Sequence, residues 1–313
     1  MAGSSAWAWL DGEYLPWAEA KIHVRTECVM RGGSVFEGVP GYWSAAQGDL
    51  FLFRLEAHMR RLEASMRVMR MQLPYSLAVL ENVVSELVRR CNFREDVHVR
   101  PTVYFGVGSA FGFKPAEIEV GAFVTATPMP RVEGRAEAGI RMAVSSWTRN
   151  SEANQPPRVK ASGSYLNGRF AQVQAVVDGY DGAILLSRAG HVAEGPAACL
   201  MMVRGGVIST PRLSDGILDS ITRSTLIECL GRELELRVEE RAIGRTELYI
   251  ADELFECGSG HEITPIVAVD RFPVGDGRVG PVTRRTMELY RRIVRGEMTQ
   301  YRSWLTPVYR TAD

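Results

Sequence analysis

Apolar positions in the first part of the chain follow two different spacings. Between residues 54 and 71 they recur at intervals of three and four, as on one face of a helix. Shorter stretches rich in Val, Phe, Tyr and Thr lie between Gly and Pro, which is typical of strands. An Asp-Gly pair at residues 11–12 predicts a hairpin turn. The predicted elements are a hairpin over residues 9–15, strands over 49–54, 97–107 and 118–126, and helices over 54–71 and 75–91.

The periodicity is interrupted near residues 128–138. This stretch combines turn-forming residues with charges, which indicates a linker between two domains. We therefore expect an N-terminal small α/β domain over residues 1–130, a linker over 131–138 and a larger C-terminal domain over 139–313.

The second part of the chain predicts a further mixture of strands and helices. No repeat at a fixed period occurs, which excludes solenoids. We expect an α+β protein of two domains, with mixed sheets and flanking helices. The predicted elements are a strand over residues 140–146, a helix over 163–178, a meandering sheet of strands over 183–186, 190–192, 199–203 and 207–210, and a helix over 222–234.

Composition narrows the classes of partner. Hydrophobic residues make up 46% of the chain and charged residues 24%, as in soluble globular proteins. Lys plus Arg equals Asp plus Glu at 37 each, so no net charge attracts nucleic acid or an anionic membrane. No run approaches the roughly 18 apolar residues that a membrane span needs. We expect a cytoplasmic protein that binds small molecules, and neither nucleic acid nor a membrane.

Neither the cysteines nor the histidines show metal-binding spacing. The five cysteines include no C-x-x-C pair, and the five histidines include no H-x-x-x-H pair. The odd cysteine count also argues against a disulfide framework. We predict reduced, structural cysteines and no metal.

Lysine is rare in this chain. The 37 basic residues include only Lys21, Lys114 and Lys160. Schiff-base chemistry is limited to these positions, because arginine stays protonated. Lys160 lies in a segment of small residues between a polar loop and a predicted helix, where partial burial is easier to achieve than on an exposed helix. Taken alone, these features still favour an ordinary solvated lysine.

The segment Lys160-Ala-Ser-Gly-Ser-Tyr165-Leu resembles the cofactor-lysine segment of the branched-chain-aminotransferase-like family, the fold-type IV enzymes that use pyridoxal 5′-phosphate (PLP). Other segments follow in the order found in that family. They are Ser34-Val-Phe-Glu-Gly, His58-Met-Arg-Arg-Leu, Gly179-Tyr-Asp-Gly-Ala, Gly190-His-Val-Ala-Glu194-Gly, Gly216-Ile-Leu-Asp-Ser-Ile-Thr-Arg, Ala251-Asp-Glu-Leu-Phe, Glu262-Ile-Thr-Pro and Gly280-Pro-Val-Thr. The resemblance implies a class IV aminotransferase, or D-amino-acid-aminotransferase-like, fold with a PLP-binding C-terminal domain.

The resemblance implies catalytic roles for three residues. Lys160 would carry PLP as a Schiff base and move a proton to and from the substrate. Glu194 would pair with the pyridine nitrogen, and Tyr165 would hydrogen-bond the phenolic oxygen of PLP. Without the resemblance, the turn context of Glu194 favours an ordinary solvated glutamate, and core packing would account for Tyr165.

Five further positions match the family's other cofactor contacts. Ile221 and Thr222 open a predicted helix, whose N-terminus offers backbone donors and a positive end to a phosphate. A plain serine cap would give the same local sequence. Arg60 lies next to Arg61, the arginine that matches the family, and either side chain could instead be solvated on its helix. The matching positions are Arg61, Ser259, Ile221 and Thr222 for the phosphate and Leu218 for the pyridine face.

The predicted substrate pocket departs from the branched-chain enzymes. Phe36 and Arg100 are retained. The departures are Arg31 and His98 in place of tyrosines, Pro40 in place of an arginine, Cys199 in place of an asparagine, and Gly260-His261 in place of small alanine-like residues. An apolar pocket gains nothing from a guanidinium and an imidazole, because unpaired buried charge is costly.

We therefore hypothesise that Arg31 and His98 bind a carboxylate or hydroxyl group on a more polar substrate, which would suit specialised metabolism. The alternative is that Arg31 extends into solvent and His98 only substitutes for a tyrosine hydroxyl.

The resemblance as a whole implies a PLP-dependent aminotransferase that moves an amino group between an L-amino acid and a 2-oxo acid and works as a homodimer. One alternative is a fold-type IV lyase similar to aminodeoxychorismate lyase, and another is a D-amino-acid or amine transaminase. The weakest is a non-catalytic binding protein with a PLP-enzyme fold, since Lys160, Tyr165 and Glu194 are all retained.

Overall fold

The computed structural model describes residues 6–108, 114–129 and 134–310. The chain forms two compact units. Unit 1 comprises Met1–Pro130, Val159–Gly163 and Arg292–Asp313, and unit 2 comprises Arg131–Arg158 and Ser164–Arg291. Within the described residues, no helix is both long and apolar enough to cross a membrane.

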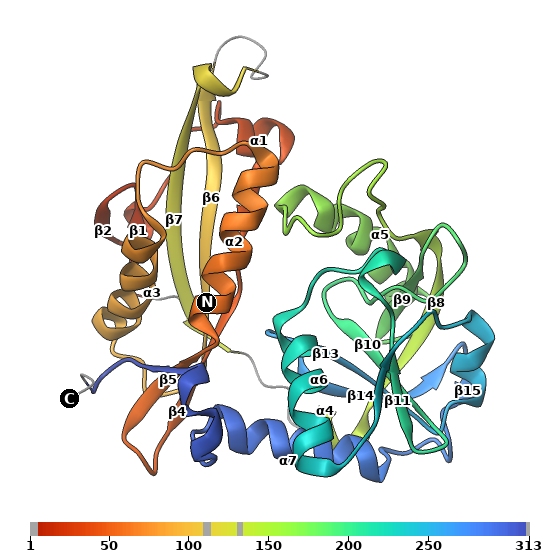
Figure 1. Ribbon diagram of the computed structural model, residues 1–313. Coiled ribbons are helices and arrows are strands. Elements are labelled where there is room, and N and C mark those ends of the chain that lie inside the picture. Colours follow the sequence, from red (N-terminus) through yellow and green to blue (C-terminus); the bar gives the residue numbers. More distant parts are fainter. Residues whose placement is uncertain (1–5, 109–113, 130–133, 311–313) are drawn as a thin grey trace. The chain divides into compact units, whose positions relative to one another are not determined.

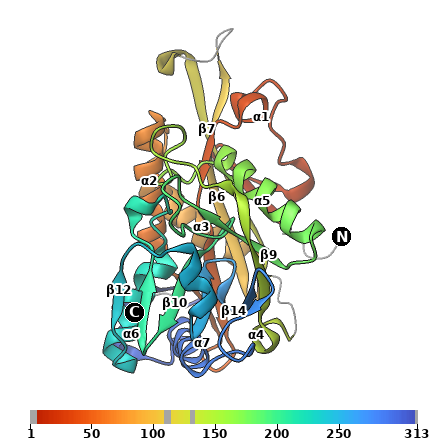
Figure 2. The same cartoon turned by 90° about the vertical axis from the view of Figure 1, so that its right-hand side faces the viewer.

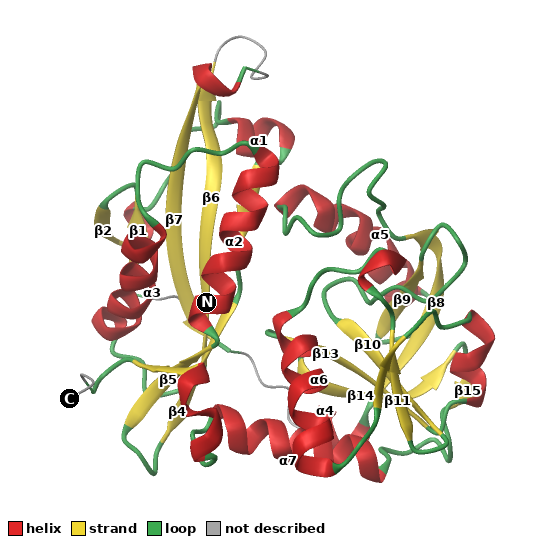
Figure 3. Ribbon diagram, viewed as in Figure 1, coloured by secondary structure: helices red, strands yellow, loops and turns green. Residues whose placement is uncertain are grey.

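Unit 1 is built on an antiparallel sheet of eight strands (Figure 3). Their order is β16-β5-β4-β6-β7-β1-β2, and β3 also pairs with β6. The strands are β1 (Trp7–Leu10), β2 (Glu13–Pro16), β3 (Ser34–Phe36), β4 (Val39–Ser44), β5 (Asp49–Phe53), β6 (Val97–Gly108), β7 (Ile118–Pro128) and β16 (Leu305–Pro307). The helices are η1 (Trp17–Glu19), α1 (Glu27–Arg31), α2 (Leu55–Met69), α3 (Leu77–Cys91), η2 (Pro115–Glu117) and η6 (Thr299–Trp304).

The predicted hairpin and the two long predicted helices of unit 1 are confirmed. Asp11 and Gly12 both have positive φ, as the tight turn between β1 and β2 requires. Helix α3 begins after Ser76, whose side-chain oxygen accepts a hydrogen bond from the Val79 N–H at 3.4 Å. Helices α2 and α3 lie against the sheet (Figure 1) and bury one apolar face each, including Leu62 of α2. This burial excludes water from the core of unit 1.

Unit 2 contains a mixed sheet of eight strands in the order β12-β11-β10-β13-β14-β8-β9, with β15 paired to β14. The strands are β8 (Ile140–Thr148), β9 (Gly182–Leu186), β10 (Cys199–Arg204), β11 (Val207–Thr210), β12 (Val238–Glu240), β13 (Glu253–Gly258), β14 (Glu262–Val269) and β15 (Phe272–Pro273). The helices are α4 (Arg135–Ala138), η3 (Ser162–Ser164), α5 (Tyr165–Val177), η4 (Leu213–Asp215), α6 (Ile221–Leu234), η5 (Arg245–Ile250) and α7 (Pro281–Val294). Of these, η3 and α7 run across the division between the units.

The predicted meander in unit 2 is only partly correct. Strands β10 and β11 form the expected hairpin, but β9 lies at the edge of the sheet and pairs in parallel with β8. Helix α5 connects these two strands and packs on both (Figure 2). Residues 190–192 form no strand and make only isolated bridges. The reason is that a strand–helix–strand crossover returns the chain in the same direction, so β9 cannot continue a meander.

The division into units differs from the predicted domains in two segments. The first stretch of unit 1 ends at Pro130, and the unit also includes Val159–Gly163 and the C-terminal Arg292–Asp313. Strand pairing is the cause, because Ala161 bridges to Val35 and β16 pairs with β5. The predicted linker over residues 131–138 lies partly outside the described residues, and its described part contains α4.

Candidate active site

The predicted site residues are divided between the two units. Unit 1 carries Arg31, Phe36, Arg61, His98, Arg100 and Lys160. Unit 2 carries Tyr165, Glu194, Leu218, Ile221, Thr222, Ser259, Gly260 and His261.

Lys160 is held by its backbone beside β3. Its N–H donates to Ser65 Oγ at 3.2 Å, and its carbonyl oxygen accepts from the Phe36 N–H at 3.0 Å. Its Nζ lies 5.1 Å from the centroid of the Phe36 ring. Lys21 and Lys114 are exposed, whereas Lys160 is partly buried. Lys160 is therefore the lysine of this chain with packed surroundings.

Three more predicted residues lie near Lys160 in unit 1. The Arg100 guanidinium carbon is 3.6 Å from the Phe36 ring centroid, a cation–π contact. His98 packs against Gly38, where a Cβ would come within 2.5 Å of His98 Nε2, so this close approach requires glycine. The structure thus brings Phe36, Arg100 and Lys160 together, and His98 lies two residues before Arg100 on β6.

The electrostatics of His98 and Arg31 bear on the expected polar pocket. Burial lowers the pKa of His98 to about 4, and the charges of Arg100 and Lys160 add to the effect. The imidazole is therefore neutral at pH 7, able to donate one hydrogen bond but bringing no positive charge. Arg31 pairs with Glu27 at 2.6 Å on α1, and its side chain is 44% exposed.

A buried charged network lies beside these residues in unit 1. Glu37 is fully buried and accepts two hydrogen bonds from Arg61, from Nε at 2.7 Å and from Nη2 at 2.8 Å. His58 Nδ1 lies 2.7 Å from the same carboxylate. Burial alone would raise the pKa of Glu37, but the charge and hydrogen bonds of Arg61 and the His58 contact hold it well below its ordinary range.

His58 takes part in this network as a neutral ring. Burial lowers its pKa below the ordinary value, against the opposing effect of Glu37. Because a carboxylate only accepts, Nδ1 carries the proton and Nε2 does not. His58 Nε2 is buried, with no hydrogen-bond partner among the described residues. Arg61, the predicted phosphate contact, is therefore oriented by Glu37, which is oriented by His58.

In unit 2, the predicted Glu194 is 4% exposed and surrounded by donors. Arg149 Nε donates to its Oε1 at 2.8 Å, and the Leu218 N–H lies 3.2 Å from Oε1 and 3.3 Å from Oε2. Cys199 Sγ is 3.5 Å from Oε2. The structure thus brings together the predicted Glu194 and Leu218, and it adds Arg149, which sequence reasoning did not identify.

Helix α6 begins at the predicted phosphate-binding residues Ile221 and Thr222, both buried. Ser220 caps the helix by accepting from the Arg223 N–H at 3.3 Å. The first turn of a helix leaves its other N–H groups without intrahelical acceptors, and these groups suit an anion. The predicted helix start at Thr222 is thus shifted by one residue.

The remaining predicted residues lie at a turn and at a helix start. Ser259, Gly260 and His261 lie between β13 and β14, where His261 Nε2 is 3.9 Å from Glu256 Oε1. Tyr165 is the first residue of α5 and is partly buried.

Three residues in these contacts escaped sequence reasoning: Glu37, His58 and Arg149. Glu37 and His58 both lie inside segments that carry the family resemblance, which would have been the means to find them. Arg149 lies in none of those segments, and nothing in its local sequence indicates its partner.

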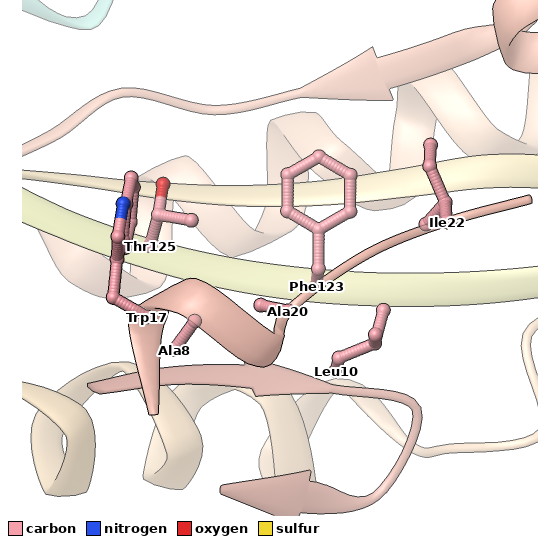
Figure 4. Close-up of a pocket in the computed structure, with 7 residues that line it drawn as sticks. All are labelled: Ala8, Leu10, Trp17, Ala20, Ile22, Phe123 and Thr125. Atoms are coloured by element: carbon pink, nitrogen blue, oxygen red, sulfur yellow. The ribbon is translucent and has the colours of Figure 1, made fainter. Parts of the chain in front are cut away.

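Unit 1 also contains an apolar pocket with a volume of about 250 Å³ (Figure 4). It is lined by Ala8, Leu10, Trp17, Ala20, Ile22, Phe123 and Thr125. None of these lining residues has a side chain that titrates near neutral pH, so this pocket offers no acid–base chemistry. Across the described part of the chain, no group of three or more His, Cys, Asp or Glu is placed to hold a metal ion.

Comparisons with known proteins identify the family of this chain. The family model described as "Amino-transferase class IV" matches residues 34–269. A "Probable branched-chain-amino-acid aminotransferase" of Aquifex aeolicus is 38% identical over 98% of both chains. The PLP form of the branched-chain amino acid aminotransferase from Thermobaculum terrenum has a TM-score of 0.92 at 39% identity, covering 98% of this chain and 99% of that one. A branched-chain aminotransferase from Thermoproteus uzoniensis, solved with norvaline, has a TM-score of 0.91 at 39% identity, covering 97% of this chain and 100% of that one.

Proposed function

The chain belongs to the class IV aminotransferase family, and we propose that it is a PLP-dependent aminotransferase of the branched-chain type. It would move an amino group between an L-amino acid and a 2-oxo acid. The observation that carries this proposal is that Lys160, the partly buried lysine among three, is the one at the family's cofactor-lysine position.

The donor chemistry of both units fits PLP. Unit 1 offers the amine of Lys160 and the guanidinium of Arg61, and unit 2 offers the buried carboxylate of Glu194 and the first turn of α6. We propose that Arg61, Ser259, Ile221 and Thr222 hold the phosphate, that Tyr165 hydrogen-bonds the phenolic oxygen and that Leu218 packs on the ring. PLP, when bound, supplies an electron sink for negative charge at the substrate α-carbon.

Two residues of the chain have separate roles in the proposed reaction. Lys160 would hold PLP through its Nζ, and the same amine, when free, would remove and return a proton at the substrate α-carbon. Glu194 would accept a hydrogen bond from the ring nitrogen and keep that nitrogen protonated. The alternatives, a lyase or a transaminase for D-amino acids or amines, share these residues and differ in product.

Absorption spectroscopy with a panel of amino acids tests the proposal. We expect the purified protein with PLP to show a visible band that L-amino acids of the correct class abolish and a 2-oxo acid restores. A band that only D-amino acids abolish would favour the D-amino-acid alternative, and pyruvate release without amino transfer would favour the lyase. Failure to bind PLP would leave the non-catalytic alternative.

We further propose that substrate contacts at Phe36, Arg100, His98, Arg31, Gly260 and His261 admit a more polar side chain than in typical branched-chain enzymes. A neutral His98 supports a hydrogen bond to a hydroxyl or carboxylate group. Arg31 shares its guanidinium with Glu27, which supports a contact weaker than a dedicated ion pair. Such a specificity would suit specialised metabolism.

Replacing His98 by tyrosine tests the pocket proposal. We expect His98→Tyr to raise kcat/KM for leucine relative to serine or glutamate by about tenfold, because one hydrogen bond contributes about 0.5–1.5 kcal/mol and 1.4 kcal/mol is tenfold. The ratio is measured in the same coupled assay for both enzymes. An unchanged ratio would mean that His98 makes no contact with the substrate side chain.

We propose that the enzyme is a homodimer that uses the apolar stripe of α5. Leu166, Phe170, Val173 and Val177 recur at intervals of four, three and four, and each is at least 46% exposed. Trp147 of β8 stacks on Phe170 with ring centroids 5.0 Å apart. A stripe of this kind on a monomer surface supports burial against a partner.

The five cysteines, all free thiols, support a cytoplasmic location.

Placing a charge in the α5 stripe tests the dimer. We expect Phe170→Glu to raise the dimer dissociation constant by about tenfold or more, which is about 1.4 kcal/mol. Sedimentation velocity over a range of concentrations measures it. The matched control is Val68→Glu, because Val68 is 58% exposed on α2 and lies outside the stripe. Equal dissociation constants for the two variants would remove α5 from the interface.

A further inference from the structure

Arg149 and Glu194 form a buried ion pair in unit 2. Arg149 follows directly after β8, and its backbone N–H donates to the Leu186 carbonyl at 2.8 Å. Its Nε and Nη2 lie 2.8 Å and 2.5 Å from the same oxygen, Glu194 Oε1. The side chains are only 10% and 5% exposed. Arg149 therefore directs both nitrogens at one oxygen of a carboxylate that solvent hardly reaches.

The second oxygen of Glu194 is held much less firmly. Cys199 Sγ lies 3.5 Å from Oε2, and the Leu218 N–H, which also lies near Oε1, is 3.3 Å from Oε2. Burial raises the pKa of the Cys199 thiol well above its usual value, so this neighbour is neutral and only a weak donor. Oε2 thus retains the capacity to accept one strong hydrogen bond.

Among the described residues that contact the Glu194 carboxylate, Arg149 is the one that carries a charge. The nearby Arg223 is engaged elsewhere, with Thr210 Oγ1 at 3.0 Å, the Pro211 carbonyl at 2.7 Å and Glu240 at 2.6 Å. The charge that compensates buried Glu194 therefore comes from Arg149 alone among these neighbours.

We propose that Arg149 is a positioning residue that holds Glu194 as a carboxylate. The proton that Glu194 shares with the ring nitrogen of bound PLP then stays on that nitrogen. This inference rests on the proposed function. A carboxyl group and a pyridine nitrogen can share one proton as an ion pair or as a neutral pair, and burial favours the neutral pair. A cation on the far oxygen reverses that preference, because it stabilises the carboxylate. The proton then stays where the ring withdraws electrons best.

The location of this proton can be measured with PLP labelled with ¹⁵N in the ring. We expect the ¹⁵N chemical shift in the wild-type enzyme at neutral pH to be that of a protonated ring. In Arg149→Gln, which keeps a donor but loses the charge, the shift should move most of the way to the value of an unprotonated reference compound. Arg149→Met should behave alike, and Arg149→Lys, which keeps the charge, should retain the protonated value.

Two matched controls separate charge from packing. Cys199→Ala removes a neutral neighbour of the same carboxylate and should leave the ¹⁵N shift at the wild-type value. Arg141→Gln removes an exposed arginine of β8, which pairs with Asp181 at 3.4 Å, and should change neither the shift nor the affinity for PLP.

Each outcome bears on one claim. A protonated ring in Arg149→Gln, or an unprotonated ring in Arg149→Lys, overturns the role of Arg149. If Arg149→Met fails to fold, the Gln and Lys variants still decide the question. Failure of the wild-type protein to bind labelled PLP would instead overturn the proposed function. A wild-type enzyme with an unprotonated ring would overturn this inference while leaving the aminotransferase proposal standing.

Discussion

Replacing Lys160 by alanine should lower the rate of amino transfer by at least about 10³-fold, since a positioned proton-transfer group alone contributes about 10²–10⁴-fold. The visible absorption band of bound PLP should shift or disappear at the same time. Neither of the other lysines can take over, because Lys21 and Lys114 are exposed and Lys114 pairs with Glu117 at 2.8 Å.

The variant should nevertheless fold. The contacts that anchor this segment are made by backbone atoms, with the Lys160 N–H bound to Ser65 Oγ and its carbonyl bound to the Phe36 N–H. Alanine retains both. Activity is measured by single turnover with PLP-loaded protein, and Lys114→Ala is the matched control. A Lys160→Ala enzyme that retains more than about a tenth of the wild-type rate would contradict the assignment. A tenfold loss of rate is smaller than the roughly 10²-fold or more that a general base contributes.

Replacing Arg61 by methionine should lower the free energy of unfolding by about 3–5 kcal/mol, even without PLP. The reason is that Glu37 is fully buried and loses the partner that donates two of its hydrogen bonds. Urea denaturation followed by tryptophan fluorescence measures the change. Five of the six tryptophans report on unit 1, namely Trp7, Trp9, Trp17, Trp43 and Trp304.

The double variant Glu37→Gln, Arg61→Met is the control for this prediction. It removes both charges and should recover much of the lost stability, because no unpaired charge remains buried. If the double variant is no more stable than Arg61→Met, the cost comes from packing around Arg61 and not from the charge of Glu37.

The loss in Arg61→Met should also depend on pH. In the wild-type protein the folded-state pKa of Glu37 is depressed, so its contribution to stability is present above the unfolded value of about 4.3 and is lost as pH falls through the folded value. In the variant, burial without Arg61 should raise the pKa of Glu37 above its unfolded value. The difference in stability between the two proteins should therefore be largest at neutral pH and above, and it should shrink progressively as the pH falls toward and then below the unfolded value of about 4.3.

Local sequence patterns predicted the elements whose formation depends on near neighbours. The hairpin at Asp11 and Gly12 and helices α2 and α3 formed within one or two residues of their predicted bounds, because turn residues, caps and apolar spacing act over a few positions. The meander failed at β9, whose partner β8 lies some 40 residues earlier beyond a helix, as the Met142–Gly182 register shows. The sequence of a short apolar strand does not indicate which strand pairs with it.

Sequence by itself determined the chemistry that this protein can use. Three lysines and a series of family motifs in order were enough to predict a fold-type IV enzyme with Lys160 as its cofactor lysine, and the balanced charge predicted a small-molecule ligand. Only the tertiary structure decided how the charges are compensated. Glu37 with Arg61 and His58, and Glu194 with Arg149, are pairs separated by 21 to 45 positions. Whether a carboxylate or an imidazole is ionised depends on burial and on such distant partners, and folding brings those partners together.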